Sequence, residues 1–228
     1  MTKTNETYVY KRTDGRWEAR YIKGFDENGK KIFGAVYAKT KEEAIKRRNE
    51  KTGATTNTGE KAPTELNLLI LGAGTHGNDI KEIAESLRIF KKISFLDDNL
   101  AGDNILGKCV DVRNYRSEYP CAFIAIGDNK IRKKFAKLLK ELNFLMPNII
   151  SHAATVSPNA KLGEGIAIMP QATVGAATIG DGVILDANSL VNSDATIGDY
   201  VHLDCGAMVL KGKTVPENTK IKSGEVFR

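Results

Sequence analysis

The chain has 228 residues, of which 41% are hydrophobic and 27% are charged, with a formal net charge of +6. This length allows two or more domains. The sequence contains no apolar run near the roughly 18 residues that a membrane helix needs, and its first residues lack the apolar core of a secretory signal. We therefore expect a cytoplasmic protein with no membrane partner. Three cysteines without metal-ligand spacing indicate reduced thiols and no metal, namely Cys109, Cys121 and Cys205.

The excess positive charge lies in the first quarter of the chain. Residues 1–61 contain 15 Lys and Arg against 9 Asp and Glu, whereas the remaining residues contain 19 of each. A polyanionic partner should therefore bind the N-terminal part. Residues 52–65 are rich in Gly, Thr and Asn without apolar periodicity, which is typical of a linker.

The N-terminal part predicts a small antiparallel sheet and one helix. Three strand patterns, residues 8–11, 16–23 and 31–37, are separated by turn residues, and the capping pair Thr40 and Glu43 opens a helix that should end near residue 51. Along the second strand, Trp17, Ala19 and Tyr21 share one face, which can pack on the helix. The opposite face then leaves basic side chains free to contact DNA, although charged outer faces are also common on small sheets.

The same residues resemble a known DNA-binding domain. Three motifs occur in order: D-G-x-W-x-A at residues 14–19, D-x-x-G-K at 26–30, and T-K-x-E-A at 40–44. On these motifs, residues 7–50 resemble the Arm-type N-terminal domain of tyrosine integrases. The resemblance implies a DNA-contacting sheet, and strand parity gives as candidates Arg16, Arg20, Lys23 and Lys31. No later segment resembles an integrase catalytic domain, so recombination is not implied.

A glycine-rich loop follows the linker. Gly72, Gly74 and Gly77 form G-x-G-x-x-G between the apolar strand 66–71 and a helix, and Asp97 ends another strand 20 residues beyond Gly77. Such a loop lets the backbone and the helix N-terminus approach a diphosphate, while a tight strand-to-helix turn without a ligand also uses glycines. The α/β pattern contains only one more strand, residues 121–127, and one more helix, 130–142. This half sheet suits a nucleotide sugar better than a dinucleotide.

The last third of the chain has a hexad repeat. Hydrophobic residues, aliphatic except for the last, recur from Ile150 to Phe227 in steps of six, with a single step of five between Val174 and Ile179. Neither an α-helix nor an ordinary strand has this period, whereas a coil of three short strands per turn does. We therefore predict a β-helix of between four and five coils, with one shortened corner near residues 175–178.

The repeats "LGEG" and "IGDG", together with "LILGAGTHG", "SFLDD" and "FIAIGDNKIRKKFAKLL", resemble hexapeptide-repeat sugar acetyltransferases of the sialic-acid O-acetyltransferase and UDP-bacillosamine N-acetyltransferase type. The resemblance covers about residues 67–228. It implies a left-handed β-helix, acetyl-CoA as donor, a nucleotide sugar or sugar as acceptor, and a homotrimer with sites between subunits. By position it places near the nucleotide Gly72, Gly74, His76, Gly77, Asp97 and Gly127.

The sequence departs from that family where its members keep a general-base histidine. In "VNSDATIGDY" this position holds Ser193, which cannot accept a proton at neutral pH, and the neighbouring Asp194 is a weak base unless the fold buries it. His202 lies nine residues further on and is either a structural histidine or a replacement. Our catalytic candidates are therefore Ser193, Asp194 and His202.

Four segments follow from these patterns: a DNA-binding domain, a linker, a Rossmann-like nucleotide-sugar lobe and a left-handed β-helix, over residues 1–51, 52–65, 66–149 and 150–228. One functional hypothesis is acetyl-CoA-dependent N- or O-acetylation of a nucleotide-linked or free sugar. The alternative is a catalytically degenerate trimer that binds sugar or CoA and presents three arms to double-stranded DNA. A third hypothesis is that the arm has no role.

Overall fold

A computed structural model of the chain describes residues 9–25, 31–52 and 66–228. The chain divides into two compact units, Met1–Ala62 and Pro63–Arg228. Most of the predicted linker, residues 53–65, and the second predicted turn, 26–30, lie outside the described residues. Within the described part, no helix combines the length and apolar character needed to cross a bilayer.

The first unit is an antiparallel sheet in the order β1-β2-β3, packed on one helix. The strands are β1 (Val9–Lys11), β2 (Trp17–Phe25) and β3 (Lys31–Ala38), and the helix is α1 (Lys41–Thr52). Ala19, Ala38 and Ala44 form its small core, with Trp17 packed against them. The predicted cap is present, because the Glu43 amide donates to Thr40 Oγ1 at 3.2 Å.

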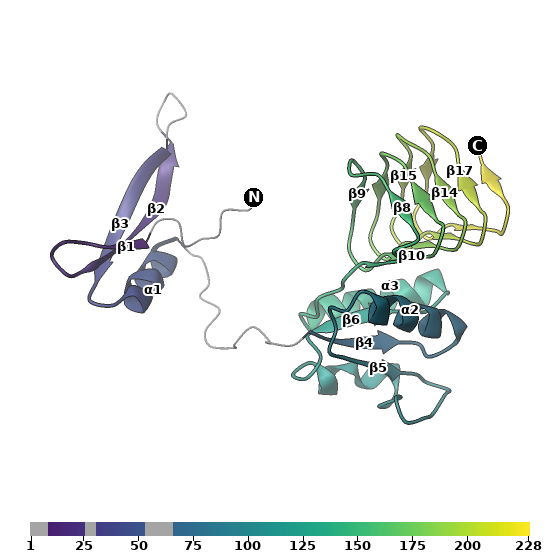
Figure 1. Cartoon of the computed structure of the whole chain (residues 1–228), viewed down its shortest axis with the longest axis horizontal. Helices are drawn as coiled ribbons and strands as arrows, with labels where there is room; N and C mark the ends of the chain where they lie inside the picture. The colour runs from purple at the N-terminus through teal and green to yellow at the C-terminus, as the bar shows by residue number, and fades with distance from the viewer. Residues whose placement is uncertain (1–8, 26–30, 53–65) are drawn as a thin grey trace. The chain divides into compact units, whose positions relative to one another are not determined.

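The second unit begins with a three-stranded parallel sheet in the order β5-β4-β6 (Figure 1). The strands are β4 (Asn67–Leu71), β5 (Lys92–Leu96) and β6 (Cys121–Ile124). Alternate residues of β4 face opposite layers: Leu68 and Ile70 pack with α2 (Thr75–Ser86), and Leu69 and Leu71 pack with α3 (Asn129–Glu141). A 3-10 helix, η1 (Cys109–Tyr115), was not predicted, because its seven residues show no helical periodicity.

The hexad repeat forms a left-handed β-helix of two-residue strands, as predicted. Its three parallel sheets are β7-β10-β13-β16-β19, β8-β11-β14-β17-β20 and β9-β12-β15-β18, which we call the first, second and third sheets. The strands are β7 (Ile149–Ile150), β8 (Thr155–Val156), β9 (Lys161–Leu162), β10 (Ala167–Ile168), β11 (Thr173–Val174), β12 (Thr178–Ile179), β13 (Ile184–Leu185), β14 (Leu190–Val191), β15 (Thr196–Ile197), β16 (His202–Leu203), β17 (Met208–Val209), β18 (Thr214–Val215), β19 (Lys220–Ile221) and β20 (Val226–Phe227).

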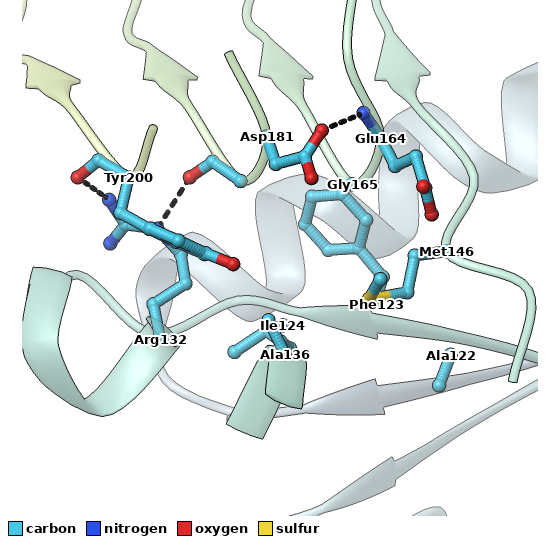
Figure 2. Close-up of a pocket in the computed structure, with 11 residues that line it drawn as sticks. Ala122, Phe123, Ile124, Arg132, Ala136, Met146, Glu164, Gly165, Asp181 and Tyr200 are labelled. Atoms are coloured by element: carbon cyan, nitrogen blue, oxygen red, sulfur yellow. Dashed lines mark hydrogen bonds between the residues drawn. The ribbon is translucent and has the colours of Figure 1, made fainter. Parts of the chain in front are cut away.

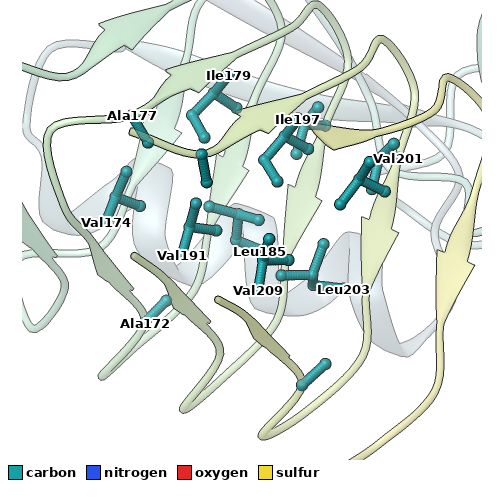
Figure 3. Close-up of a cluster of buried hydrophobic side chains, with 14 of the residues drawn as sticks. Ala172, Val174, Ala177, Ile179, Leu185, Val191, Ile197, Val201, Leu203 and Val209 are labelled. Carbon is teal, nitrogen blue, oxygen red and sulfur yellow. The ribbon is translucent and has the colours of Figure 1, made fainter. Parts of the chain in front are cut away.

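The second residue of each strand points into the coil, where the aliphatic side chains stack in a continuous core (Figure 3). The single five-residue step is accommodated between β11 and β12, where the Ala177 amide donates to the Gly175 carbonyl at 2.8 Å. This tight turn replaces a longer corner, as the spacing predicts. Val174 and Ile179 therefore remain in the core on either side of it.

The first residues of the strands in the first sheet form an outward column. Ile149, Ala167 and Ile184 lie in register and share a core with α2 and the parallel sheet. The column continues with His202 and Lys220. The surface of the β-helix thus changes from apolar to polar along this column.

A buried arginine joins α3 to the corners of the β-helix. Arg132 is 1% exposed, and its guanidinium donates to the carbonyls of Gly182 and Tyr200 at 2.7 and 2.8 Å (Figure 2). The same group donates to the Ile126 carbonyl at 2.9 Å and to Asn129 Oδ1 at 2.9 Å. Burial lowers the pKa of Arg132 to about 10. Carbonyl oxygens from the lobe and from two coils therefore hold one cation between them.

Candidate active site

The glycine loop contains two structural glycines and one that faces open space. Gly72 has φ 101°, and a Cβ there would lie 2.8 Å from the Ala125 carbonyl oxygen; a Cβ on Gly77 would overlap the Gly72 carbonyl oxygen. A Cβ on Gly74, or on Gly127 in the loop after β6, would meet no atom within 4 Å. The tight turn therefore explains Gly72 and Gly77. Gly74 and Gly127 border open space that a ligand could occupy.

The N-terminus of α2 is suited to an anion. Gly74 is its N-cap and supplies no side-chain hydrogen bond, and the first turn contains no acidic residue. The first N–H groups of a helix have no partner within it, and they carry the positive end of its dipole. Because α2 follows β4 at the carboxyl edge of the sheet, these groups lie where open α/β sheets bind phosphates.

Asp97 holds this loop in place. Its Oδ2 accepts from the Ala73 amide at 2.7 Å, and its Oδ1 accepts from the Asn99 and Leu100 amides at 2.8 Å. Burial alone would raise the pKa of Asp97, but the backbone hydrogen bonds outweigh it and lower this pKa. Both oxygens are thus occupied by the backbone, and we assign Asp97 to positioning the loop.

A groove opens beside the loop that follows β6. It has a volume of about 520 Å³ and is lined by Gly127, Asp128, Asn129, Lys130, Asn218 and Lys220. Asp128 caps α3 by accepting from the Ile131 amide at 2.8 Å. Asn129 Nδ2 donates to the Asn218 carbonyl at 2.9 Å. The groove therefore combines the N-terminus of α3 with a late coil of the β-helix.

His202 is the centre of a charged cluster on the first sheet. The side chain is buried, and its Nε2 lies 2.9 Å from Asp186 Oδ2 and 3.2 Å from Asp204 Oδ1. Lys220 Nζ lies 3.1 Å from the same Asp204 oxygen. The sequence reasoning missed Asp186 and Asp204. Their signal was the pair of motifs "LDAN" and "LDCG". Each motif begins with an inward leucine, and these two leucines pair with one another one coil apart.

The other ring nitrogen of His202 indicates its tautomer. Nδ1 is buried and has no hydrogen-bond partner within the described part of the chain. A hydrogen on Nδ1 would be an unpaired buried donor, whereas an Nε2–H can donate to Asp186. The three ligand-type atoms of Asp186, His202 and Asp204 lie within 4.8 Å of one another, but a metal on Nε2 would require that unpaired Nδ1–H. The geometry therefore favours an Nε2–H tautomer with a lone pair on Nδ1.

His76 lies close to this cluster. It precedes Ile80 by one helical turn, and Ile80 shares a core with Ile184, which neighbours His202 in the outward column. Burial lowers the pKa of His76, with Asp186 raising it and His202 lowering it further. Its Nε2 is buried and has no partner among the described residues. The structure thus brings together two histidines that the sequence singled out separately.

The other two catalytic candidates lie elsewhere on the β-helix. Ser193 and Asp194 follow β14 of the second sheet, where Ser193 Oγ accepts from the Ala176 amide at 3.3 Å. Asp194 is exposed and lies 3.4 Å from Lys211 Nζ. Asp194 is therefore not buried, and one chain does not bring these residues to His202.

The basic candidates of the first unit are paired with acids. Arg16 Nη2 lies 2.9 Å from Asp14, and Arg20 Nε lies 2.7 Å from Glu18. The expectation that Arg16 and Arg20 are free is therefore wrong. The alternation of a strand predicts which face a side chain lies on, but it does not predict which acidic side chains lie beside it there. Lys23 lies in β2 and Lys31 begins β3, and their side chains lie outside the described residues.

Glu18 is 2% exposed on the face opposite α1. It accepts from the Tyr10 hydroxyl and from Arg12 and Arg20, and the Arg20 hydrogen bond is the main cause that lowers its pKa to about 2. The Arg12 and Arg16 guanidiniums lie over the Tyr37 ring, at 5.4 and 5.7 Å from its centre. The outer face is thus an ordered array of guanidiniums and aromatic rings.

Comparison with known proteins finds similarities that lie in the second unit. Residues 67–139 match the PglD N-terminal domain. The acetyltransferase domain of PglB from Neisseria gonorrhoeae, solved with acetyl coenzyme A, is 28% identical, with a TM-score of 0.63 over 70% of this chain and 89% of that one. A second structure of the same domain is 29% identical, with a TM-score of 0.65 over 71% of this chain and 91% of that one.

PerB from Caulobacter crescentus, solved with CoA and GDP-perosamine, is 25% identical, with a TM-score of 0.60 over 71% of this chain and 88% of that one. The second unit is therefore similar in sequence and fold to these sugar acetyltransferases. The matched family domain lies wholly in that unit, so the resemblance of residues 7–50 to integrases stays a prediction.

Proposed function

We propose that this chain transfers the acetyl group of acetyl-CoA to an amino or hydroxyl group of a nucleotide-linked sugar. The observation that carries the proposal is the uncapped N-terminus of α2 behind Gly74, at the carboxyl edge of the sheet. The similarity to PglB with acetyl coenzyme A and to PerB with CoA and GDP-perosamine supports both substrates. The nucleotide diphosphate would lie against Gly74 and the first turn of α2, in a crevice between this loop after β4 and the loop after β6 that contains Gly127.

In this reaction the acceptor nitrogen or oxygen attacks the thioester carbonyl. The new C–N or C–O bond replaces the C–S bond, CoA leaves as its thiolate, and the acceptor proton must go to a base. No metal takes part in this scheme. Ser193 occupies the family's base position but cannot accept a proton at neutral pH, so the sequence candidates for this base are Asp194 and His202.

The test is acetyl transfer by the full chain. Purified protein is incubated with acetyl-CoA and a panel of UDP- and GDP-linked amino sugars, and both CoA thiol release and the acetylated product are measured. Gly74→Leu should abolish sugar binding by filling the open space, whereas Gly102→Leu, which also meets no atom within 4 Å, serves as the matched control. Transfer that survives Gly74→Leu would contradict the placement of the diphosphate.

The same assay distinguishes the degenerate alternative. A chain that binds nucleotide sugar by calorimetry but turns over none of the panel is a binding protein. If Ser193→His then gains activity, the natural chain has lost its base. Turnover by the unmodified chain refutes this alternative.

We also propose a homotrimer, as the resemblance implies. Ser193 follows a strand of the second sheet and the crevice lies by the first, so a site that used both would need two copies of the chain. Light scattering on a sizing column measures the copy number directly. A monomer at the concentration of the activity assay would refute a site shared between copies.

For the first unit we propose binding to double-stranded DNA. The supporting observation is the outer sheet face, where Arg12, Arg16 and Arg20 stand beside Tyr10 and Tyr37. Anisotropy of a labelled duplex should show affinity that falls steeply between about 50 and 200 mM salt. Arg16→Ala should weaken binding, and the exposed Lys134→Ala in the second unit should not. Affinity independent of salt would refute phosphate contacts.

A further inference from the structure

We propose that the proton acceptor of this chain is a relay of two histidines, His76 and His202, backed by Asp186 and Asp204. The inference rests on the proposed acetyl transfer and deepens it. It gives a role to a buried charged cluster that lies apart from the Ser193 position.

The first step is the fixed orientation of His202. Asp186 accepts the Nε2–H at 2.9 Å, so Nδ1 carries a lone pair. Asp204 lies 3.2 Å from Nε2, and Lys220 shares its oxygen at 3.1 Å. A carboxylate behind an imidazole holds its tautomer and stabilises the imidazolium when a proton arrives. The cluster therefore has the parts of a base: an oriented acceptor nitrogen and a compensating charge.

The second step is the link to the crevice. His202 is 7% exposed, so its Nδ1 needs an intermediary to receive a proton from a bound substrate. His76 is only half-buried and lies in the first turn of α2, two residues after Gly74. It sits on the same face of α2 as Ile80, which packs on the first sheet beside Ile184. His76 is therefore the side chain between the loop and the cluster.

The third step is the complementarity of the two unpaired nitrogens. His76 Nε2 and His202 Nδ1 are both buried without a partner in the described part of the chain. With His202 fixed as an acceptor at Nδ1, a hydrogen on His76 Nε2 is the matching donor across one bridging water. His76 Nδ1 then carries the lone pair that meets the acceptor group.

The proton transfer balances in this arrangement. As the acceptor nitrogen or oxygen attacks the thioester, its proton passes to His76 Nδ1, and the Nε2 proton of His76 passes to His202 Nδ1. The resulting imidazolium lies against Asp186 and Asp204. The reverse relay returns the proton to the departing CoA thiolate, so neither histidine is consumed.

The decisive experiment is a double-mutant cycle on acetyl transfer by the full chain. His76→Gln and His202→Gln should each lower kcat by roughly 10²- to 10⁴-fold, and the double variant should be no slower than the slower single one. The control is His152→Gln, because His152 is exposed and lies outside the cluster. Asp186→Asn should lower kcat at least about tenfold while the KM for nucleotide sugar changes little. Circular dichroism shows whether each variant is folded.

Two outcomes overturn the relay. One is a double variant whose loss equals the product of the single losses, since independent histidines do not pass a common proton. The other is a His202→Gln variant with unchanged kcat, with the loss appearing instead in Ser193→Ala.

A measurement that does not depend on turnover, the tautomer of His202, tests the relay independently of the proposed function. The chain contains three histidines, so the ring nitrogens can be assigned by nitrogen NMR with one variant each. His202 should show a protonated Nε2 and an unprotonated Nδ1, and Asp186→Asn should alter that signal. The opposite tautomer overturns the relay even in an active enzyme. An inactive chain with the expected tautomer refutes the proposed function, and with it the catalytic role of the relay.

Discussion

Replacing Arg132 by alanine should destabilise the second unit strongly. The guanidinium is 1% exposed and is bonded by carbonyl oxygens of Gly182, Tyr200 and Ile126 and by Asn129 Oδ1. Alanine would leave these acceptors without a donor and would open a gap between α3 and the β-helix. Each buried acceptor left without a donor costs about 1–3 kcal/mol and the gap adds to this, so we expect a loss of about 3–5 kcal/mol in unfolding free energy. For a unit of this size, that is a fall in melting temperature of roughly 6–20 °C.

Scanning calorimetry of the full chain measures this change. Lys133→Ala is the matched control, because Lys133 is the next residue of α3 and its ion pair with Glu217 is exposed. That variant should leave the unfolding free energy almost unchanged, because an exposed ion pair contributes little to stability. Arg132→Lys keeps the charge but loses the planar fork, so it should fall between the two. If Arg132→Ala costs no more than Lys133→Ala, the arginine does not join the lobe to the β-helix.

Two further predictions concern the glycine loop and the first unit. Gly77→Ala should destabilise the fold by about 1–3 kcal/mol, because its Cβ overlaps the Gly72 carbonyl, whereas Gly74→Ala should stay within about 0.5 kcal/mol. Chemical denaturation compares the two, and equal effects would contradict the division into structural and open glycines. The pKa of Glu18 is lowered from 4.5 to about 2, so its stabilising contribution is complete above pH 4.5 and is lost as the pH falls towards 2. Fluorescence of Trp17 should report this acid unfolding, and Glu18→Gln should make it less dependent on pH over that window.

The sequence predicted most of the fold because its periodicities are local. The hexad positions, the five-residue step and the cap at Thr40 each depend on neighbours within a few residues, and each was confirmed. The candidate site was predicted less completely. Asp186, His202 and Asp204 meet only because successive coils stack with the register that pairs Ile184 with His202. A one-residue change in coil length would separate them. This register depends on the length of a whole coil, so no short segment of the sequence predicts it.

The burial of Glu18 was missed for a related reason. Alternation placed it correctly on the outer face of β2, but burial came from the long side chains of Tyr10, Arg12 and Arg20 closing over it. Such closure depends on rotamers and cross-strand pairing, which alternation does not specify. Arg20, which the sequence interpretation left free, became a partner of this buried carboxylate for this reason.

The stacking of the β-helix has a consequence for how the chain acquires its structure during synthesis. Each strand pairs with the strand one coil earlier, and the first of them, Ile149–Ile150, packs on α2 of the preceding lobe. A lobe that has left the ribosome can therefore offer a finished surface to the first coil, which in turn offers its edge to the next. No coil has to wait for a distant segment. Assembly can follow the direction of translation, with little exposed strand edge at any moment.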